Sequence, residues 1–298
     1  VYNILEPVFR DQAVFCRPDR SLIVVDRNST AEHVLLNSPS ASFSGLPVYV
    51  LPENRAKAGA VAAGLARIME ESGFQFVVTR DCDGDHAAED IPRLVNMGFD
   101  IKEQTERELV SVIGARPSLE KPMGWVREQW ELLTNQVLLD LVNFSLAQRG
   151  SVVDARFWGG QDPDLQSGYR LYDRMAAEKA VSCIEALPED RTIWTFSCEY
   201  IPFAELMICG GIFGQVQRRT LVEQPVTSYG SVDLADVYGR LMVYVAINYE
   251  IPIPVLLQIF DNAVCSLSLL FTDKKEDLLR CRRLISADDS MSPGPRFV

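Results

Sequence analysis

The chain has 298 residues, of which 47% are hydrophobic and 23% are charged, and this composition excludes a disordered or collagen-like chain. The length suffices for one large α/β domain or for two small ones. The formal net charge of -12, from 29 basic and 41 acidic residues, argues against a nucleic-acid-binding surface. We therefore expect no nucleic acid among the partners.

Short apolar runs alternate with segments of helical periodicity in the first half of the chain. The expected strands cover residues 21–26, 47–51, 74–78 and 109–114, and the expected helices cover residues 57–73, a segment from 91, 125–148 and 178–186. This alternation predicts an α/β fold with a doubly wound, mostly parallel sheet flanked by helices. Because no linker interrupts the chain, we expect one continuous domain with a mixed C-terminal elaboration.

The cysteines and the apolar stretches bear on location. The seven cysteines are an odd number without Cys-x-x-Cys spacing, which favours reduced thiols in the cytoplasm. The apolar stretch 241–271 contains Asn248, Glu250 and Asp261, unlike a membrane span of about 20 apolar residues. Residues 137–144 are expected to be core; if exposed, they would contact a lipid or a second subunit. Peripheral membrane contact and a homo-oligomer both stay open.

Polar side chains follow three of the predicted strands. Asp26, Asn54 and Asp81 each lie where a strand ends, and ligands of such sheets bind beyond the carboxyl ends of the strands. We therefore expect the three to converge on one crevice. There Asp26 would accept hydrogen bonds from a nucleotide base or ribose, although capping of the next segment would also explain it.

Residues 80–92 read Arg-Asp-Cys-Asp-Gly-Asp-His-Ala-Ala-Glu-Asp-Ile-Pro and follow a buried apolar run. They present Asp81, Asp83 and Asp85 at alternate positions, and three such carboxylates repel one another unless a cation lies between them. Oxygen ligands suit Mg²⁺ or Mn²⁺, which bridge to substrate phosphates. The plainer alternative is an acidic surface turn, since Asp-Gly is a strong turn signal.

Five blocks in chain order, taken together, carry a resemblance to a known family. They are Val-Val-Asp-Arg-Asn-Ser-Thr (24–30), Asn-Arg-Ala-Lys-Ala-Gly-Ala (54–60), the acidic block (81–92), Val-Ile-Gly-Ala-Arg (112–116) and Asp-Leu-Gln-Ser-Gly-Tyr-Arg-Leu-Tyr (164–172). They resemble motifs of the family 2 glycosyltransferases with the GT-A fold. Within that family the chain is most similar to the polyprenol-phosphate sugar transferases, such as dolichol-phosphate mannose and glucose synthases.

The resemblance implies a GT-A domain over residues 1–220, with residues 221–298 as a helical elaboration packed on it. It also implies a metal-dependent enzyme that moves a sugar from a nucleotide-sugar to a small-molecule or lipid-phosphate acceptor, such as a polyprenyl phosphate. Asp81, Asp83 and Asp85 would hold Mg²⁺ or Mn²⁺. Three residues depart from the family pattern: Arg27 replaces a second Asp, Ala56 replaces a Gly, and Asp85 stands where relatives often have Gln.

The resemblance further assigns roles to individual residues. Donor binding is expected of Asp26, Asn54, Lys57, Asp81 and Asp83. Asp164 is the expected catalytic base, with Glu199 as the alternative base. Acceptor phosphate is expected to bind Arg116, Arg127 and Arg170; such an acceptor is already ionised and needs no strong base.

Two other functions stay open at this point. A nucleotidyltransferase could use a similar sheet, but it normally needs a Gly-rich basic loop near the N-terminus, which residues 1–20 lack. A non-catalytic nucleotide-sugar-binding protein with the same fold is the other alternative.

Overall fold

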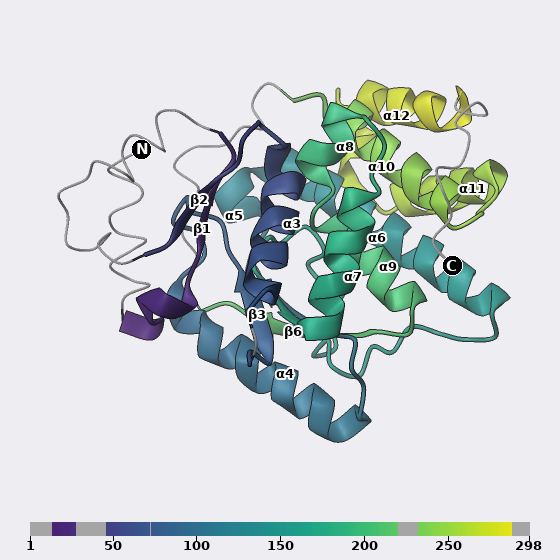
Figure 1. Ribbon diagram of the computed structural model, residues 1–298. Helices are drawn as coiled ribbons and strands as arrows, with labels where there is room; N and C mark the ends of the chain where they lie inside the picture. The colour runs from purple at the N-terminus through teal and green to yellow at the C-terminus, as the bar shows by residue number, and fades with distance from the viewer. Residues whose placement is uncertain (1–13, 28–45, 72, 220–231, 288–298) are drawn as a thin grey trace.

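Helices cover both faces of a four-stranded sheet in the computed structural model, which describes residues 14–27, 46–71, 73–219 and 232–287 (Figure 1). The expected α/β fold is therefore confirmed. The strands of this sheet are β3 (Phe76–Thr79), β4 (Val110–Ala115), β5 (Arg170–Asp173) and β6 (Ile212–Gln217).

The sheet is mixed, whereas the sequence predicted a mostly parallel one. Its order is β3-β5-β4-β6; β5 is antiparallel to both neighbours, and β4 and β6 are parallel. The difference arises because the chain re-enters the sheet at the edge where β4 ends, as the pairing of Ile113 with Arg170 shows. Since β5 opposes both β3 and β4, the strands β3, β4 and β6 all end at one edge, where β5 begins.

The two strands predicted nearest the N-terminus form a separate ladder. In it β1 (Ile23–Val25) pairs in parallel with β2 (Val48–Val50). The helix α3 (Ala56–Met69) follows β2 and contacts β1, β3 and α7 (Arg174–Glu185). It thereby joins the small ladder to the main sheet.

Each face of the main sheet has its own hydrophobic cluster. On one face, Leu94 and Ile101 of α4 (Ile91–Thr105) cluster with Val112. The adjacent residue Ile113 belongs instead to the larger cluster on the other face, beside α7 and α9 (Tyr200–Ile208). Successive residues of a strand point to opposite faces, so β4, whose residues are all buried, packs on both sides.

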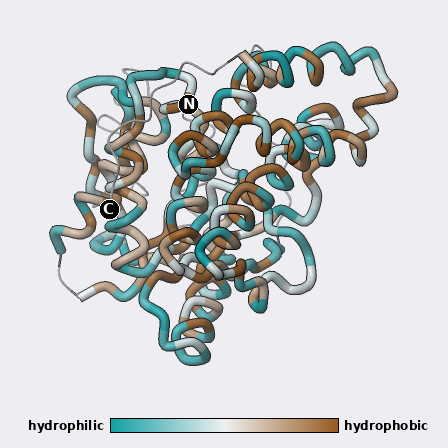
Figure 2. Tube along the Cα trace, turned by 90° about the vertical axis from the view of Figure 1, so that its right-hand side faces the viewer, coloured by the Kyte–Doolittle hydropathy of each residue, from teal (hydrophilic) through white to brown (hydrophobic). Residues whose placement is uncertain are grey.

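The helix α6 (Trp125–Gln148) coincides with the predicted long helix and is surrounded by other helices. It contacts α9, α10 (Leu234–Asn248) and α11 (Ile253–Val264). Each of these helices contributes buried residues to the larger hydrophobic cluster, and hydrophobic and hydrophilic stretches alternate along the chain in Figure 2. In the described part of the chain, no helix is long and apolar enough to cross a membrane.

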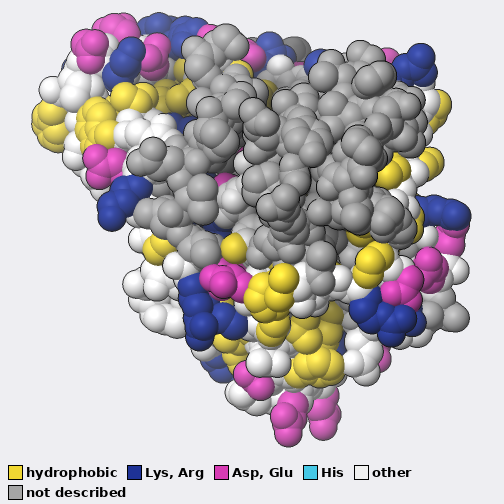
Figure 3. Space-filling view, turned by 90° about the vertical axis from the view of Figure 1, so that its left-hand side faces the viewer, with side chains coloured by type: hydrophobic (Ala, Val, Ile, Leu, Met, Phe, Trp, Pro, Cys, Tyr) yellow, Lys and Arg dark blue, Asp and Glu magenta, His cyan; other side chains and the backbone are white. Residues whose placement is uncertain are grey.

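The remaining helices are short or peripheral. They are α5 (Glu120–Met123), α8 (Arg191–Phe196), α12 (Lys275–Ala287) and the 3-10 turns η1 (Pro18–Arg20), η2 (Ala88–Asp90) and η4 (Ser268–Phe271). On one described face, basic, acidic and hydrophobic side chains lie next to one another below the grey region (Figure 3). This part of the face therefore carries no stripe of a single charge.

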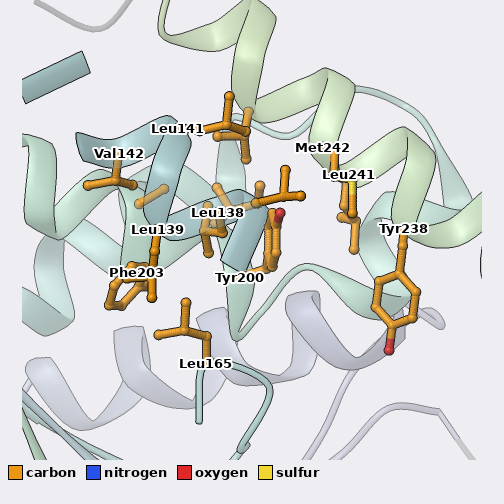
Figure 4. Packing of buried hydrophobic residues seen from close by; sticks show 14 of the residues in the cluster. Leu138, Leu139, Leu141, Val142, Leu165, Tyr200, Phe203, Tyr238, Leu241 and Met242 are labelled. Carbon is orange, nitrogen blue, oxygen red and sulfur yellow. The ribbon is translucent and has the colours of Figure 1, made fainter. Parts of the chain in front are cut away.

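Most apolar side chains between residues 137 and 144 are core residues, as the sequence predicted. Figure 4 shows their packing, with side chains from α6 (Leu138, Leu139, Leu141, Val142), α9 (Tyr200, Phe203) and α10 (Tyr238, Leu241, Met242). Helices on both sides of residue 220 thus share one core. The expected domain boundary at residue 220 lies outside the described residues.

The backbone at Ala56 explains one feature of the sequence. Ala56 opens α3 with a φ of +58°, a conformation that glycine adopts at little cost and other residues rarely adopt. It stands where the resembled motif has Gly. The glycine of that motif therefore suits the tight entry from β2 into the helix.

We expect Ala56→Gly to be better tolerated than Ala58→Gly. Both alanines are buried in α3, so both changes remove a buried methyl group. At position 56 glycine also relieves about 1 kcal/mol of left-handed strain, whereas in the helix interior it costs about 1 kcal/mol of propensity. Urea unfolding should show Ala56→Gly to be more stable than Ala58→Gly by about 2 kcal/mol. Equal losses of stability in the two variants would contradict backbone strain at Ala56.

Candidate functional site

Lys57 links three segments at the common edge of the strands. Its Nζ lies 2.7 Å from Asp81 Oδ2 and 2.7 Å from Glu199 Oε1. Asp81 follows β3, Lys57 lies in the first turn of α3, and Glu199 precedes α9. Burial lowers the pKa of Lys57, but the two carboxylates outweigh it and hold that pKa well above its usual value. The amine is therefore a permanent cation between two acidic groups.

The carboxylate of Asp81 responds to the same contact. Burial alone would raise its pKa, but the Lys57 ammonium lowers the pKa of Asp81 to about 2. Its side chain is still 31% exposed. Asp81 is therefore ionised and accessible at neutral pH.

Gly168 lies against this bridge, and its lack of a side chain lets the loop before β5 approach. A Cβ at this position would lie 3.0 Å from Lys57 Nζ and 3.1 Å from both Asp81 Oδ2 and Glu199 Oε1. These separations are tighter than ordinary van der Waals contact, so a larger residue would push the charged atoms apart. The sequence places Gly168 in a motif, but only the structure shows what it approaches.

His86 organises the turn that carries the three aspartates. The Asp81 amide donates to His86 Nδ1 at 2.8 Å, and Asp85 Oδ1 lies 3.0 Å from His86 Nε2. Burial lowers the pKa of His86 to about 4, although the nearby aspartates oppose this effect. The ring is therefore neutral at pH 7, with its proton on Nε2, and it stacks on Tyr169 with centroids 4.9 Å apart.

Asp85 differs from the other two aspartates because its carboxylate is directed inward. It is 5% exposed and lies between His86 and Arg218, whose Nη1 is 3.7 Å from Asp85 Oδ2. The described residues contain no group of three or more His, Cys, Asp or Glu side chains placed to hold a metal. The predicted ligand set of three aspartates is thus not assembled, because Asp85 serves an internal pair.

Asp81 and Asp83 still fit a divalent cation. Burial, followed by the charges of Asp85 and Asp81, raises the pKa of Asp83 to about 6, and a bound cation would relieve this repulsion. Mg²⁺ commonly uses one or two carboxylates and completes its octahedron with water and substrate phosphates. Two half-exposed carboxylates are therefore a sufficient protein contribution.

Arg116 and Asp164 form a buried, bidentate ion pair. Asp164 Oδ2 accepts from Arg116 Nε at 2.8 Å, and Oδ1 accepts from Nη2 at 2.5 Å. Their side chains are 5% and 7% exposed. Burial raises the pKa of Asp164, but Arg116 outweighs burial and keeps that pKa below its usual value. Both oxygens of the predicted base are therefore already engaged by a cation.

Glu131 extends this pair into a cluster. It is fully buried in α6 and accepts from Arg116 Nη2 at 2.6 Å and from Arg127 Nε at 2.9 Å. Arg116 and Arg127, which were expected to bind an acceptor phosphate, thus both bind carboxylates of the protein. The sequence reasoning did not single out Glu131.

Arg170 supports the neighbouring loop from inside the protein. It is 1% exposed and donates to the carbonyl oxygens of Ser167, at 3.0 Å, and Leu165, at 2.6 Å. Direct contact with an acceptor phosphate, as the sequence suggested, does not fit this burial. The geometry assigns Arg170 to holding the loop that carries Asp164 and Gly168.

Asp26 and Asn54 meet, as their places at strand ends predicted. Asn54 Nδ2 donates to the Asp26 carbonyl at 3.0 Å, and Asp26 Oδ1 accepts from the Arg55 amide at 2.6 Å. Arg191 of α8 donates to the carbonyl oxygen of Asn54 at 3.1 Å and also to its side-chain oxygen. The sequence gave no sign of this contact, which fixes the loop from a distant helix.

Cys198 is excluded as a thiolate nucleophile. Its Sγ donates to Glu199 Oε2 at 2.8 Å, and burial, aided by the Glu199 charge, holds its pKa well above the usual value. The thiol therefore stays protonated at neutral pH.

No model of a known protein family matches the chain, and a comparison with curated proteins finds no match.

We expect Asp164→Asn to lower the free energy of unfolding by about 3 to 5 kcal/mol, because it breaks a buried ion pair. Glu70→Gln is the control: it breaks the exposed Arg67–Glu70 pair and should change stability by less than about 1 kcal/mol. The pKa of Asp164 is lowered on folding, so its stabilisation holds above the ordinary aspartate range and fades as the pH falls. Urea unfolding at several pH values tests this; an effect as small as the control's would contradict it.

Proposed function

We propose that this chain is a glycosyltransferase that moves a sugar from a nucleotide-sugar donor to an acceptor, with Mg²⁺ or Mn²⁺ at Asp81 and Asp83. One observation carries the proposal. Two half-exposed carboxylates, Asp81 and Asp83, follow β3 at the edge where β4 and β6 also end, and Lys57 connects Asp81 to Glu199. Ligands of α/β sheets bind at this edge, and the resemblance to GT-A enzymes agrees with it.

The donor side would work through groups already close together. When bound, the cation would neutralise the diphosphate that leaves, without moving a proton. Lys57 Nζ, 2.7 Å from Asp81 Oδ2, adds a fixed positive charge where that negative charge develops. Asp26 and Asn54, held together by a hydrogen bond, would orient the nucleoside from the ends of β1 and β2.

Glu199 is a better candidate base than Asp164. Both oxygens of Asp164 accept from Arg116, which lowers its affinity for a proton. Glu199 Oε2 accepts from the Cys198 thiol, and thiols are weak donors. Glu199 also contacts the same Lys57 ammonium as Asp81, so it lies next to the proposed donor site.

A non-catalytic nucleotide-sugar-binding protein is the second candidate. It is favoured by the internal pairing of the candidate carboxylates: Lys57 pairs with Asp81 and Glu199, and Arg116 pairs with Asp164. Such a protein would bind the donor and show no transfer.

Donor binding is tested by thermal unfolding with a panel of nucleotide-sugars and Mn²⁺. A ligand of the native state at 100 times its Kd stabilises it by about 2.7 kcal/mol, so the correct donor should raise the Tm clearly. We expect the shift to be lost with EDTA and in Asp83→Asn. The control Glu89→Gln, an exposed acid of the same segment, should keep it. A panel in which no donor shifts the wild type would contradict the proposal.

The role of Glu199 is tested separately by Glu199→Gln, which keeps the shape of the side chain and removes its charge. We expect donor-induced stabilisation to persist and the transfer rate to fall by about 100-fold or more, as for loss of a general base. Transfer at the wild-type rate would remove Glu199 from the chemistry. Donor binding by the wild type with no transfer to any acceptor would favour the non-catalytic candidate.

A further inference from the structure

The acceptor side of the site is electrically neutral in itself. Arg116 and Arg127 supply two positive charges, and Glu131 and Asp164 supply two negative charges. We call these four residues the acceptor-side ion cluster. Arg116 Nη2 contacts both carboxylates, at 2.6 Å and 2.5 Å, and Arg127 Nε contacts Glu131 at 2.9 Å. Glu131, which joins the two arginines, is fully buried.

Two further arginines, Arg170 and Arg218, are also engaged by groups of the protein. Arg170 is 1% exposed and donates to backbone carbonyls of its own loop. Arg218 follows β6 as Arg116 follows β4. Its side chain is 3% exposed, and Nη1 donates to the carbonyl oxygen of Asp85 at 2.8 Å. Neither guanidinium offers an exposed surface to an incoming anion.

The N–H groups of Arg116 and Arg127 that bind Glu131 and Asp164 could bind a phosphate only if it displaced one of these carboxylates. The displaced carboxylate would then stay in the interior without its cation, which is strongly unfavourable. Because Glu131 lies within the core helix α6, it cannot move out to water without disturbing that helix. The cluster therefore occupies its arginines and opposes a second anion.

We propose that the acceptor is an uncharged hydroxyl compound, such as a sugar or another alcohol, and not a lipid phosphate. This inference rests on the proposed glycosyltransferase function and specifies its acceptor class. The resemblance to polyprenol-phosphate sugar transferases implies a lipid-phosphate acceptor instead. We depart from it because Glu131 already pairs with both Arg116 and Arg127.

A hydroxyl acceptor also gives Glu199 a task. The acceptor oxygen forms a bond to the anomeric carbon while the bond from that carbon to the donor diphosphate breaks. The nucleoside diphosphate leaves, and the hydroxyl proton passes to the Glu199 carboxylate. An ionised phosphate would have no proton to give, whereas a hydroxyl group needs a base within hydrogen-bond reach.

Phosphate binding can be measured without donor and without turnover. Farnesyl phosphate would be titrated calorimetrically into the wild type and into Arg127→Gln. The measured quantity is the part of the affinity for farnesyl phosphate that depends on Arg127. We expect no difference between the two proteins up to about 1 mM ligand. Wild-type binding that Arg127→Gln abolishes would overturn the proposal.

Glu131→Gln tests the opposite change, an increase in the affinity for farnesyl phosphate. It leaves the two arginines with one positive charge in excess, so farnesyl phosphate should bind at least about tenfold more tightly than to the wild type. Arg127→Gln added to this variant should remove the gain. Unchanged affinity in a folded Glu131→Gln would count against the proposal. If this variant does not fold, the wild-type titration still decides.

Transfer with the stabilising donor completes the test. We expect wild-type transfer to a neutral glycoside, such as octyl glucoside, and not to farnesyl phosphate. A higher kcat/KM for farnesyl phosphate than for the glycoside would overturn the inference. Absence of donor binding and of turnover would instead count against the proposed function, while the titrations settle the phosphate question independently.

Discussion

The bidentate pair between Arg116 and Asp164 is the contact on which the rest of the candidate site depends. It joins the end of β4 to the loop before β5, and both side chains are almost fully buried. Loss of either partner would leave a buried charge, so the loop has little freedom to move. Arg170 also holds this loop, because it donates hydrogen bonds to the carbonyl oxygens of Ser167 and Leu165.

The position of this loop then determines the donor side. Gly168, four residues after Asp164, lies against Lys57, Asp81 and Glu199. Because three segments meet at one ammonium, a shift of the loop would move the carboxylates that follow β3 and precede α9. Half-exposed carboxylates thus lie on the proposed donor side, and a neutral ion cluster lies on the proposed acceptor side. This division follows from which charges the protein pairs internally.

Local patterns in the sequence predicted most of the elements. Helical periodicity identified α6, and apolar runs identified β1 to β4, because both signals lie within single segments. The rule for strand ends brought Asp26 and Asn54 together. The antiparallel insertion of β5 was not predicted, because strand direction depends on where the chain re-enters the sheet.

The pairing of charges was also beyond local reasoning. The inward direction of Asp85 depends on Arg218, which follows β6, and the bridge from Lys57 to Glu199 joins distant segments. Glu131 had one local signal, its i,i+4 spacing from Arg127. That spacing is common on exposed helices, so only the burial of α6 shows that Glu131 occupies the acceptor-side arginines.

The central claim is that Asp81 and Asp83 hold a divalent cation beside the donor diphosphate. Anomalous diffraction from crystals grown with Mn²⁺ and the nucleoside diphosphate of the stabilising donor tests it most directly. The account predicts one strong manganese peak that contacts Asp81, Asp83 and the diphosphate, with Asp85 still turned toward His86 and Arg218. A diphosphate bound elsewhere, or a manganese peak away from both aspartates, would contradict it.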